Sequence, residues 1–293
     1  MNYQTLRIVD WRASINQMVI LNSVTERLPS QRQVLMHLLK DRLTAGERLN
    51  FFALSRLISP VSVEMYALRG GFSGFWLDLE HGMATVDQIR GAFISARAVD
   101  LHQFVRMAPT GYQDVGQYLE LGAGGVMAAQ IDSADQAAEF TSWAKFPPSG
   151  VRGMNMSGVD GGFTTRSSSE FYANANDEVF VAIQIETLGA LNEVDEIAAL
   201  SNVDHLFVGP SDLSIALGNY PDFHSDVLWE AVQRVSKACS KHGKSWGAVT
   251  PDALWAERAV DLNCQIVSMS NETVALKLGV DAVKDAFQEQ FKD

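Results

Sequence analysis

Eight short apolar runs alternate along the chain with longer segments of helical periodicity, and this alternation limits the folds open to it. The runs lie at 49–55, 74–80, 102–108, 124–130, 179–186, 205–210, 245–250 and 265–270. Most of them are apolar along their whole length, which is typical of parallel strands covered by helices on both faces. The pattern therefore predicts an α/β fold built on a parallel sheet.

The segments between the apolar runs carry helix signals. Helical periodicity is clearest at 86–99, 112–122, 133–146 and 227–243. Ser133, with Gln136 three residues later, resembles a capping box. Gly122 and Gly243 are expected to end their helices, because glycine readily takes the left-handed conformation found there.

Eight strands is the number found in a closed (β/α)8 barrel, the TIM barrel, and a chain of 293 residues suits one. An open doubly wound sheet is the alternative, but no G-x-G-x-x-G motif follows the first run. No linker rich in Pro, Gly or Ser divides the chain. We therefore expect one barrel domain over 31–293, with a helix at 31–43, after an extension over 1–30 of uncertain structure.

Charge and cysteine content restrict the partners and the compartment. The formal net charge of −12 disfavours nucleic acid and membrane surfaces as main partners, because both require a basic surface. Cys239 and Cys264 have neither metal-like spacing nor the pattern of a disulfide framework, which favours the reducing cytoplasm. The first 23 residues have scattered charges and no continuous apolar core, so no signal peptide or membrane span is expected.

Catalytic groups of a (β/α)8 barrel gather at the C-terminal ends of its strands, and polar residues occur at four of the predicted ends. These residues are Asp78, Glu80 and His81, then Arg106, then Gln184 and Glu186, and finally Gly209, Pro210, Ser211 and Asp212. Core packing alone does not explain them, because carboxylates are rarely buried without a partner. We expect these residues to form one site.

Glu186 and Asp212 are the best candidates for metal ligands. Two carboxylates at neighbouring strand ends, completed by water and substrate oxygens, suit Mg²⁺ or Mn²⁺. The alternative is that each carboxylate caps the following helix. Asp212 suits that role, whereas Glu186 is a poor N-cap residue and Thr187 beside it would serve better.

Arg106 is flanked by apolar residues, so its guanidinium needs an anion. A substrate carboxylate or an enolate oxygen would match its planar fork. A buried salt bridge to Asp78 or Glu80 is the alternative, and the two roles are compatible.

His81 stands alone among the six histidines in following the C-terminal end of a predicted strand. A neutral histidine beside a carboxylate is a suitable general base near neutral pH. Because side chains alternate along a strand, Trp76, Asp78 and Glu80 are expected to point into the barrel and Leu77 to pack under the helices. Asp78 and Glu80 are then expected to position His81 rather than to bind a metal.

No lysine stands at the C-terminal end of a predicted strand, so a Schiff base is not expected. A metal ion would then have to act as the electrophile that stabilises an enolate.

With these residues assembled, the chain resembles the HpcH/HpaI aldolase family, the metal-dependent (class II) pyruvate aldolases that include 4-hydroxy-2-oxoheptanedioate aldolase. The motifs that carry the resemblance are WLDLEHG (76–82), FVRM (104–107), LELGAGGVM (119–127), FPPSGVRG (146–153), QIET (184–187) and FVGPSDLS (207–214). They occur in the family's order and spacing and cover about residues 31–285.

The resemblance implies a (β/α)8 barrel that forms a homo-oligomer, a hexamer or trimer, with the C-terminal helix packed on a neighbouring subunit. It also implies that Glu186 and Asp212 bind a divalent cation (Mg²⁺, Mn²⁺ or Co²⁺) that chelates a 2-oxo acid. The pyruvate moiety would be held by Gln184 and by the backbone around Gly209, Pro210 and Ser211.

By the same resemblance, His81 would transfer a proton through a bound water, and Arg106 would stabilise the developing negative charge. Glu120 stands where the family has an Asp that raises the basicity of the histidine. Glutamate keeps that charge but is longer by one methylene.

Three departures from the family concern the substrate. Residues 128–130 read Ala-Ala-Gln instead of V-P-M or V-P-Q, residues 154–166 replace a loop with an Arg-Ala pair near the substrate, and 1–30 has no counterpart in compact members. The expected reaction is aldol cleavage or formation of a 4-hydroxy-2-oxo acid with an unassigned aldehyde. The alternatives are decarboxylation of an oxaloacetate-like acid, whose enolate reacts with another electrophile, and an inactive barrel that serves as a binding or scaffold subunit.

Overall fold

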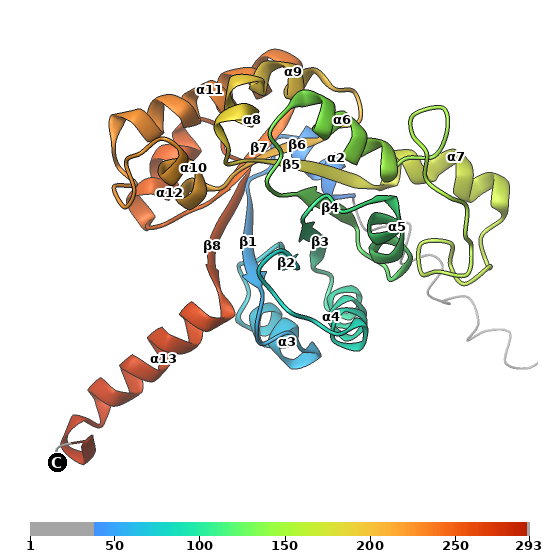
Figure 1. Cartoon of the computed structure of the whole chain (residues 1–293). Helices are drawn as coiled ribbons and strands as arrows, with labels where there is room; N and C mark the ends of the chain where they lie inside the picture. The colour runs from blue at the N-terminus through green and yellow to red at the C-terminus, as the bar shows by residue number, and fades with distance from the viewer. Residues whose placement is uncertain (1–37, 292–293) are drawn as a thin grey trace, which may run out of the picture. The chain divides into compact units, whose positions relative to one another are not determined.

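The computed structural model describes residues 38–291, in which eight parallel strands close into a barrel in the order β1 to β8 (Figure 1). The strands are β1 (Leu49–Leu54), β2 (Gly74–Asp78), β3 (His102–Met107), β4 (Gly125–Ala128), β5 (Phe180–Ile185), β6 (His205–Val208), β7 (Ser245–Val249) and β8 (Ile266–Asn271). Each strand lies within one predicted run, except that β8 extends one residue beyond its run, so the (β/α)8 prediction is confirmed. The extension over 1–30 and the first part of the helix predicted at 31–43 lie outside the described residues.

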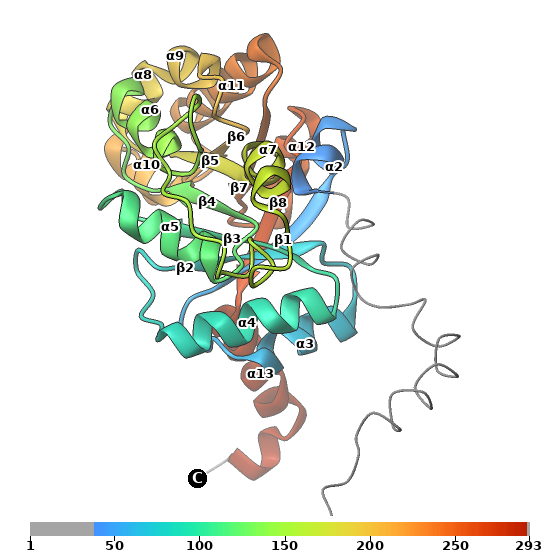
Figure 2. The same cartoon turned by 90° about the vertical axis from the view of Figure 1, so that its right-hand side faces the viewer.

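Most of the helices connect the strands and cover the barrel from outside, whereas α2 precedes β1 and α13 follows β8 (Figures 1 and 2). They are α2 (Leu39–Thr44), α3 (Pro60–Arg69), α4 (Val86–Ala98), α5 (Tyr112–Glu120), α6 (Ala134–Trp143), α7 (Ser168–Glu178), α8 (Leu188–Asn192), α9 (Val194–Ala199), α10 (Pro210–Ala216), α11 (Asp226–His242), α12 (Ala253–Asp261) and α13 (Glu272–Ala286), followed by the 3₁₀ turn η4 (Gln288–Phe291). The four clearest helical patterns correspond to α4, α5, α6 and α11. Helices α3 and α4 pack side by side (Figure 2).

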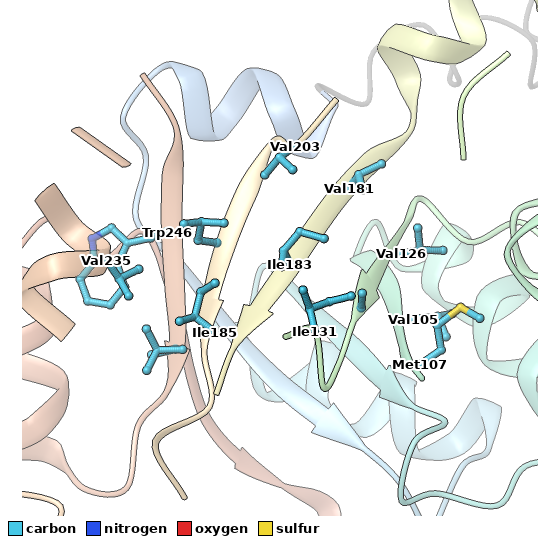
Figure 3. Packing of buried hydrophobic residues seen from close by; sticks show 14 of the residues in the cluster. Val105, Met107, Val126, Ile131, Val181, Ile183, Ile185, Val203, Val235 and Trp246 are labelled. Atoms are coloured by element: carbon cyan, nitrogen blue, oxygen red, sulfur yellow. The ribbon is translucent and has the colours of Figure 1, made fainter. Parts of the chain in front are cut away.

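Two hydrophobic cores follow from the alternation of side chains along the strands. The core outside the strands packs against the helices, and Figure 3 shows Val181, Ile183 and Ile185 along this face of β5. The core inside the barrel contains Trp76 of β2, whereas Leu77 belongs to the outer core. The predicted orientation of this strand is therefore confirmed.

Helix boundaries agree with the local signals. Ser133 caps α6 by accepting a hydrogen bond from the backbone N of Gln136. The reciprocal bond of a capping box is displaced by one residue, because Gln136 Oε1 accepts from the backbone N of Asp132. Gly243 ends α11 in the left-handed conformation, and Gly122 follows α5 with a positive φ of 102°.

Helix α13 leaves the end of β8 and points away from the barrel (Figure 1). Its first residue, Glu272, is buried and accepts hydrogen bonds from three consecutive backbone N atoms after β1, those of Ser55, Arg56 and Leu57. These bonds fix where the helix begins. Its apolar side chains beyond this anchor are exposed, namely Val274, Leu276, Leu278, Val280 and Val283.

Candidate active site

The polar residues predicted to form one site come together at the C-terminal ends of β2, β3, β5 and β6. Strand pairing sets Asp78 beside Arg106 on neighbouring strands. On β5, Gln184 alternates with Ile183 and Ile185, which face the outer core, so Gln184 points into the barrel. The barrel mouth is therefore lined by side chains from segments that are far apart in sequence.

Arg106 is buried and contacts two carboxylates. Its Nε and Nη2 donate to the two carboxylate oxygens of Asp78 at 3.1 and 2.7 Å, and Nη1 lies 3.3 Å from Glu80 Oε2. Its Cζ lies 4.9 Å from the ring centre of Trp76, whose Nε1 donates to Ser268 Oγ at 2.9 Å. The salt bridge considered as an alternative role for Arg106 is thus present, and it fixes the guanidinium at the mouth.

His81 follows β2 in a tight turn that Asp78 organises. Asp78 Oδ1 accepts hydrogen bonds from the backbone N atoms of Glu80 and His81 at 3.1 and 3.2 Å. A side chain at Gly82 would collide with the backbone oxygens of Asp78 and Ser55, so the turn requires glycine. The His81 side chain is 62% exposed, and its Nε2 lies 3.8 Å from Glu80 Oε1. The structure thus brings Asp78 and Glu80 beside a histidine that can exchange protons with solvent.

Glu186 is 1% exposed, and both of its carboxylate oxygens accept hydrogen bonds. Oε1 accepts from the backbone N and the side-chain Nε2 of Gln130 at 2.8 and 3.1 Å, and Oε2 accepts from Gln184 Nε2 at 2.5 Å. Burial, with smaller contributions from Glu80 and Asp212, raises the pKa of Glu186 to about 7 against the opposing effect of the Gln130 hydrogen bond. A bound cation would favour the ionised form of this carboxyl group.

Asp212 lies in the first turn of α10, beyond the loop that follows β6. Gly209 is the N-cap residue of α10, and no side chain caps this helix, so the alternative role of Asp212 as an N-cap is not realised. The N-cap of α8 is Thr187, whose Oγ1 accepts from the backbone N of Ala190 at 3.0 Å. As the sequence indicated, Thr187 and not Glu186 caps the helix that follows.

The loop around Gly209 packs closely against the floor of the site. A Cβ atom at Gly209 would lie 2.6 Å from Glu186 Oε2 and 2.5 Å from Gln184 Nε2, so a side chain there would displace both groups. Pro210 is buried, whereas Ser211 is exposed. The structure thus places Gly209, the residue predicted to contact the pyruvate moiety through its backbone, directly beside Gln184 and Glu186.

The charge balance of the mouth favours a bound cation. Asp78, Glu80, Glu186 and Asp212 contribute four carboxylates, and Arg106 contributes the guanidinium that neutralises one of them. Among the buried polar atoms without a hydrogen bond in the described residues are Gln184 Oε1 and Glu80 Oε2, of which the latter is ion-paired with Arg106. Excess negative charge and the unused acceptor of Gln184 suit a hard divalent cation, which prefers oxygen ligands.

Residues 38–291 do not contain three His, Cys, Asp or Glu side chains arranged as a ready metal cluster. Glu186 and Asp212 would therefore supply two ligands, and water or substrate oxygens would complete the coordination. Such incomplete protein coordination is usual for Mg²⁺. The residues present fit the metal that the sequence implied.

Glu120 is not brought to His81 within one chain. It is the last residue of α5, and the residues that follow it pack on the beginning of β3, where Gln103 Nε2 donates to the backbone oxygen of Gly122 at 2.7 Å. His81 instead follows the end of β2. Because helices of this fold run antiparallel to the strands, the two residues lie at opposite ends of the barrel. Glu120 Oε2 accepts a hydrogen bond from Asn155 Nδ2 at 2.7 Å.

The substituted loop over 154–166 also lies away from the mouth of its own barrel. The backbone N of Val159 donates to the backbone oxygen of Glu120 at 2.8 Å, which places the loop beside the end of α5. Arg152, just before the loop, is paired with Asp160 and stacks on the ring of Phe146. Within one chain the loop therefore does not face the acceptor side of the substrate.

Gln130 is a site residue that the sequence did not identify as such. In the sequence it belongs only to the departure from the family at 128–130, yet both its backbone and its side chain bind Glu186. Its position two residues after β4 was the available signal, because residues just beyond barrel strands contribute to the site.

Comparison with known proteins identifies the family. Residues 67–276 match the profile of the HpcH/HpaI aldolase/citrate lyase family. The chain belongs to this family. A 5-keto-4-deoxy-D-glucarate aldolase of Klebsiella pneumoniae subsp. pneumoniae is 28% identical over 232 residues, which cover 79% of this chain and 90% of that protein. The family and this relative support an enzyme of the lyase class.

Solved structures agree with this assignment. An HpcH/HpaI aldolase from Desulfitobacterium hafniense DCB-2 superposes with a TM-score of 0.79 at 30% identity, covering 84% of this chain and 96% of that one. An HpcH/HpaI aldolase/citrate lyase family protein from Burkholderia cenocepacia J2315 superposes with a TM-score of 0.78 at 29% identity, covering 87% of this chain and 99% of that one.

None of the helices within residues 38–291 combines the length and the hydropathy that a membrane span requires.

Proposed function

We propose that this protein is a metal-dependent aldolase that cleaves or forms the C3–C4 bond of a 4-hydroxy-2-oxo acid. The observation that carries the proposal is the buried Glu186, which lies beside Gln184 and near Asp212 at a mouth with excess negative charge. An anionic 2-oxo acid would be repelled there without a bound cation. Membership of an aldolase and citrate lyase family supports the same reaction class.

A divalent cation held by Glu186 and Asp212 would withdraw electron density from the 2-oxo group and so stabilise the enolate of pyruvate. The chain's own residues would handle orientation and protons. Gln184, with the backbone around Gly209, would orient the 2-oxo acid, and Arg106 would stabilise negative charge on the reacting oxygen.

In the cleavage direction, the C4 hydroxyl loses its proton and the C3–C4 bond breaks, which releases an aldehyde and leaves the electron pair on the pyruvate enolate. We propose that His81 accepts this proton through a bound water, and that a proton then returns to C3 of the enolate. Its exposed imidazole and the adjacent Glu80 carboxylate support this role. Within one chain, Glu80 is the carboxylate beside His81, and we propose that it supplies the role that the resemblance implied for Glu120.

The first substrate to test is 5-keto-4-deoxy-D-glucarate, because the relative from Klebsiella is an aldolase of that compound. The assay measures pyruvate release from this acid, from other 4-hydroxy-2-oxo acids and from oxaloacetate, with and without Mg²⁺, Mn²⁺ or Co²⁺. Metal-dependent cleavage of a 4-hydroxy-2-oxo acid is the expected result. Turnover of oxaloacetate alone would instead indicate the decarboxylase, and no metal-dependent turnover of any 2-oxo acid would contradict both.

The metal assignment is tested with Glu186→Gln, which keeps the shape of the side chain and removes its charge. We expect loss of bound metal, measured by elemental analysis of the purified protein, and a fall in activity of about 10³-fold, since a Lewis acid contributes several kcal/mol. Glu196→Gln on the exposed part of α9 is the matched control. Unchanged metal content in the Glu186 variant would refute the assignment and would favour an inactive binding subunit.

We also propose that the enzyme is a homo-oligomer, a hexamer or trimer, that works in the cytoplasm. The exposed apolar residues of α13 support assembly, because such side chains usually pack on a partner. Both cysteines, Cys239 and Cys264, are free and buried, which suits a reducing compartment. Light scattering of the purified protein, and of a Leu278→Asp variant, measures the oligomeric state. A monomeric wild type would contradict this proposal.

A further inference from the structure

Gln130 lies at the mouth of the barrel, two residues after the end of β4. The residue is exposed, yet its two donors reach the same buried atom, Glu186 Oε1. The backbone N lies 2.8 Å from this oxygen and the side-chain Nε2 lies 3.1 Å from it. Two donors from one residue therefore bind one oxygen of the carboxylate that carries the proposed function.

The backbone around Gln130 is held in the conformation that this contact requires. Gln130 has a positive φ of 54°, which residues other than glycine seldom adopt outside sites where the surroundings enforce it. On one side, the backbone N of Ala129 donates to the backbone oxygen of Met107 at 3.0 Å. On the other side, Thr187 Oγ1 donates to the backbone oxygen of Ile131 at 2.7 Å. The segment after β4 is thus fixed to β3 and to the residue that follows Glu186.

The other oxygen of the carboxylate has a different environment. Glu186 Oε2 lies against Gly209, in the loop that leads to Asp212, and its hydrogen bond comes from the neutral amide of Gln184. Because Gln130 binds Oε1, the carboxylate cannot rotate freely. Oε2 therefore stays directed toward the loop that carries Asp212.

We propose that Gln130 is a positioning residue for Glu186, which holds Oε1 and thereby directs Oε2 toward the cation site shared with Asp212. This inference rests on the proposed function, since it assumes that a divalent cation binds there. Residues that orient a metal ligand through a hydrogen bond commonly change metal affinity by 10- to 100-fold when they are replaced. Every substitution at position 130 except proline keeps the backbone N–H that binds Glu186. Loss of the side-chain amide alone is therefore expected to lower metal affinity by the smaller factor of that range, about 10-fold.

The experiment measures Mn²⁺ binding to metal-free full-length protein by electron paramagnetic resonance, without any substrate. Gln130→Met keeps the length of the side chain and removes its amide. Gln130→Gly also removes the amide, and glycine adopts a positive φ without strain. A loss of affinity seen in both variants therefore comes from the missing amide and not from backbone strain. Gln117→Met, on the exposed side of α5, is the matched control.

Both Gln130 variants should weaken Mn²⁺ binding about 10-fold, while the control binds as the wild type does. At saturating Mn²⁺ both variants should regain kcat to within about threefold of wild type, because a positioning residue takes no direct part in the reaction. Wild-type affinity in both variants would overturn the inference alone. Failure of the wild-type protein itself to bind Mn²⁺ would overturn the proposed function and this inference with it.

Discussion

The two ends of the barrel interior bury polar groups in different ways. At the C-terminal end, Asp78 and Glu80 lie against Arg106, and Glu186 adds a further carboxylate that Arg106 does not contact directly. At the N-terminal end, His205 of β6 is completely buried among aromatic rings and hydrogen bonded to Ser245 Oγ through Nδ1 at 2.7 Å. Burial lowers the pKa of His205 to about 3, so this residue stays neutral at neutral pH.

The difference shows where the fold accommodates charge. The N-terminal end tolerates an imidazole because the group can lose its charge, as buried histidines do. The carboxylates at the mouth outnumber their single guanidinium partner. This excess of buried charge does not stabilise the fold. Packing accounts for the buried imidazole at the N-terminal end, whereas the excess charge at the mouth is what the proposed cation would balance.

The largest expected effect comes from Arg106→Leu. It removes the cation that contacts two buried carboxylates, and breaking a buried pair from one side costs about 3–5 kcal/mol of the free energy of unfolding. Urea denaturation measures this loss. The control is Arg258→Leu. Arg258 is exposed and its guanidinium lies over the ring of Trp229, so its loss should cost about 1 kcal/mol or less. Equal losses would mean that the mouth is not held by its charge pairing.

His81→Asn should affect activity and leave stability unchanged. Loss of a proton-transfer group lowers kcat by about 10²- to 10⁴-fold. Replacing an exposed side chain usually changes the free energy of unfolding by no more than about 0.5 kcal/mol. Steady-state kinetics and thermal unfolding of the variant test both statements, with His224→Asn as the control. A normal kcat would show that another group transfers the proton.

The N-terminal end should respond to acid through His205. Its folded pKa of about 3 lies below the ordinary value of 6.5, so between these values the unfolded state binds more protons. Its contribution to stability is complete well above pH 6.5 and is lost as pH falls, and the loss reaches about 2 kcal/mol at pH 5. Urea unfolding of wild type and of His205→Phe at pH 7 and pH 5 isolates this term as the difference between the two proteins. Identical pH dependence in both would exclude His205 as its source.

The smallest effect is expected from the loss of a helix cap, for which two variants are compared. Thr187→Ala and Ser133→Ala each remove an N-cap side chain and should each cost about 1 kcal/mol of stability. Thr187 also donates to the backbone oxygen of Ile131, beside Gln130, so only its variant should weaken Mn²⁺ binding. If the Ser133 variant weakened Mn²⁺ binding equally, the effect would come from general destabilisation.

Local patterns in the sequence were sufficient for much of the barrel. The eight apolar runs became strands, and the alternation of Trp76 and Leu77 predicted which side chain enters the barrel. The sequence favours Thr187 over Glu186 as a cap, and Thr187 is the N-cap of α8, because capping depends on a few neighbouring residues. The meeting of Asp78 with Arg106 followed from strand order alone.

The prediction for Glu120 is not supported within one chain, and the reason is geometric. A helix that starts after a strand's C-terminal end returns to the opposite end, so the last residue of α5 cannot lie at the mouth. The same reasoning applies to the loop over 154–166, which joins α6 to α7. Sequence similarity aligned these segments with the family but did not show which end of the barrel they occupy.

The sequence by itself determined the strand count, the inward faces of the strands and the residue types at their C-terminal ends, because these depend on local periodicity. The tertiary structure decided the state of each site residue. Glu186 is buried, bound by Gln130 after β4 and pressed against Gly209 after β6, an environment assembled from three separate segments. Burial and hydrogen bonding depend on which segments meet in space, and only the closed barrel brings these together.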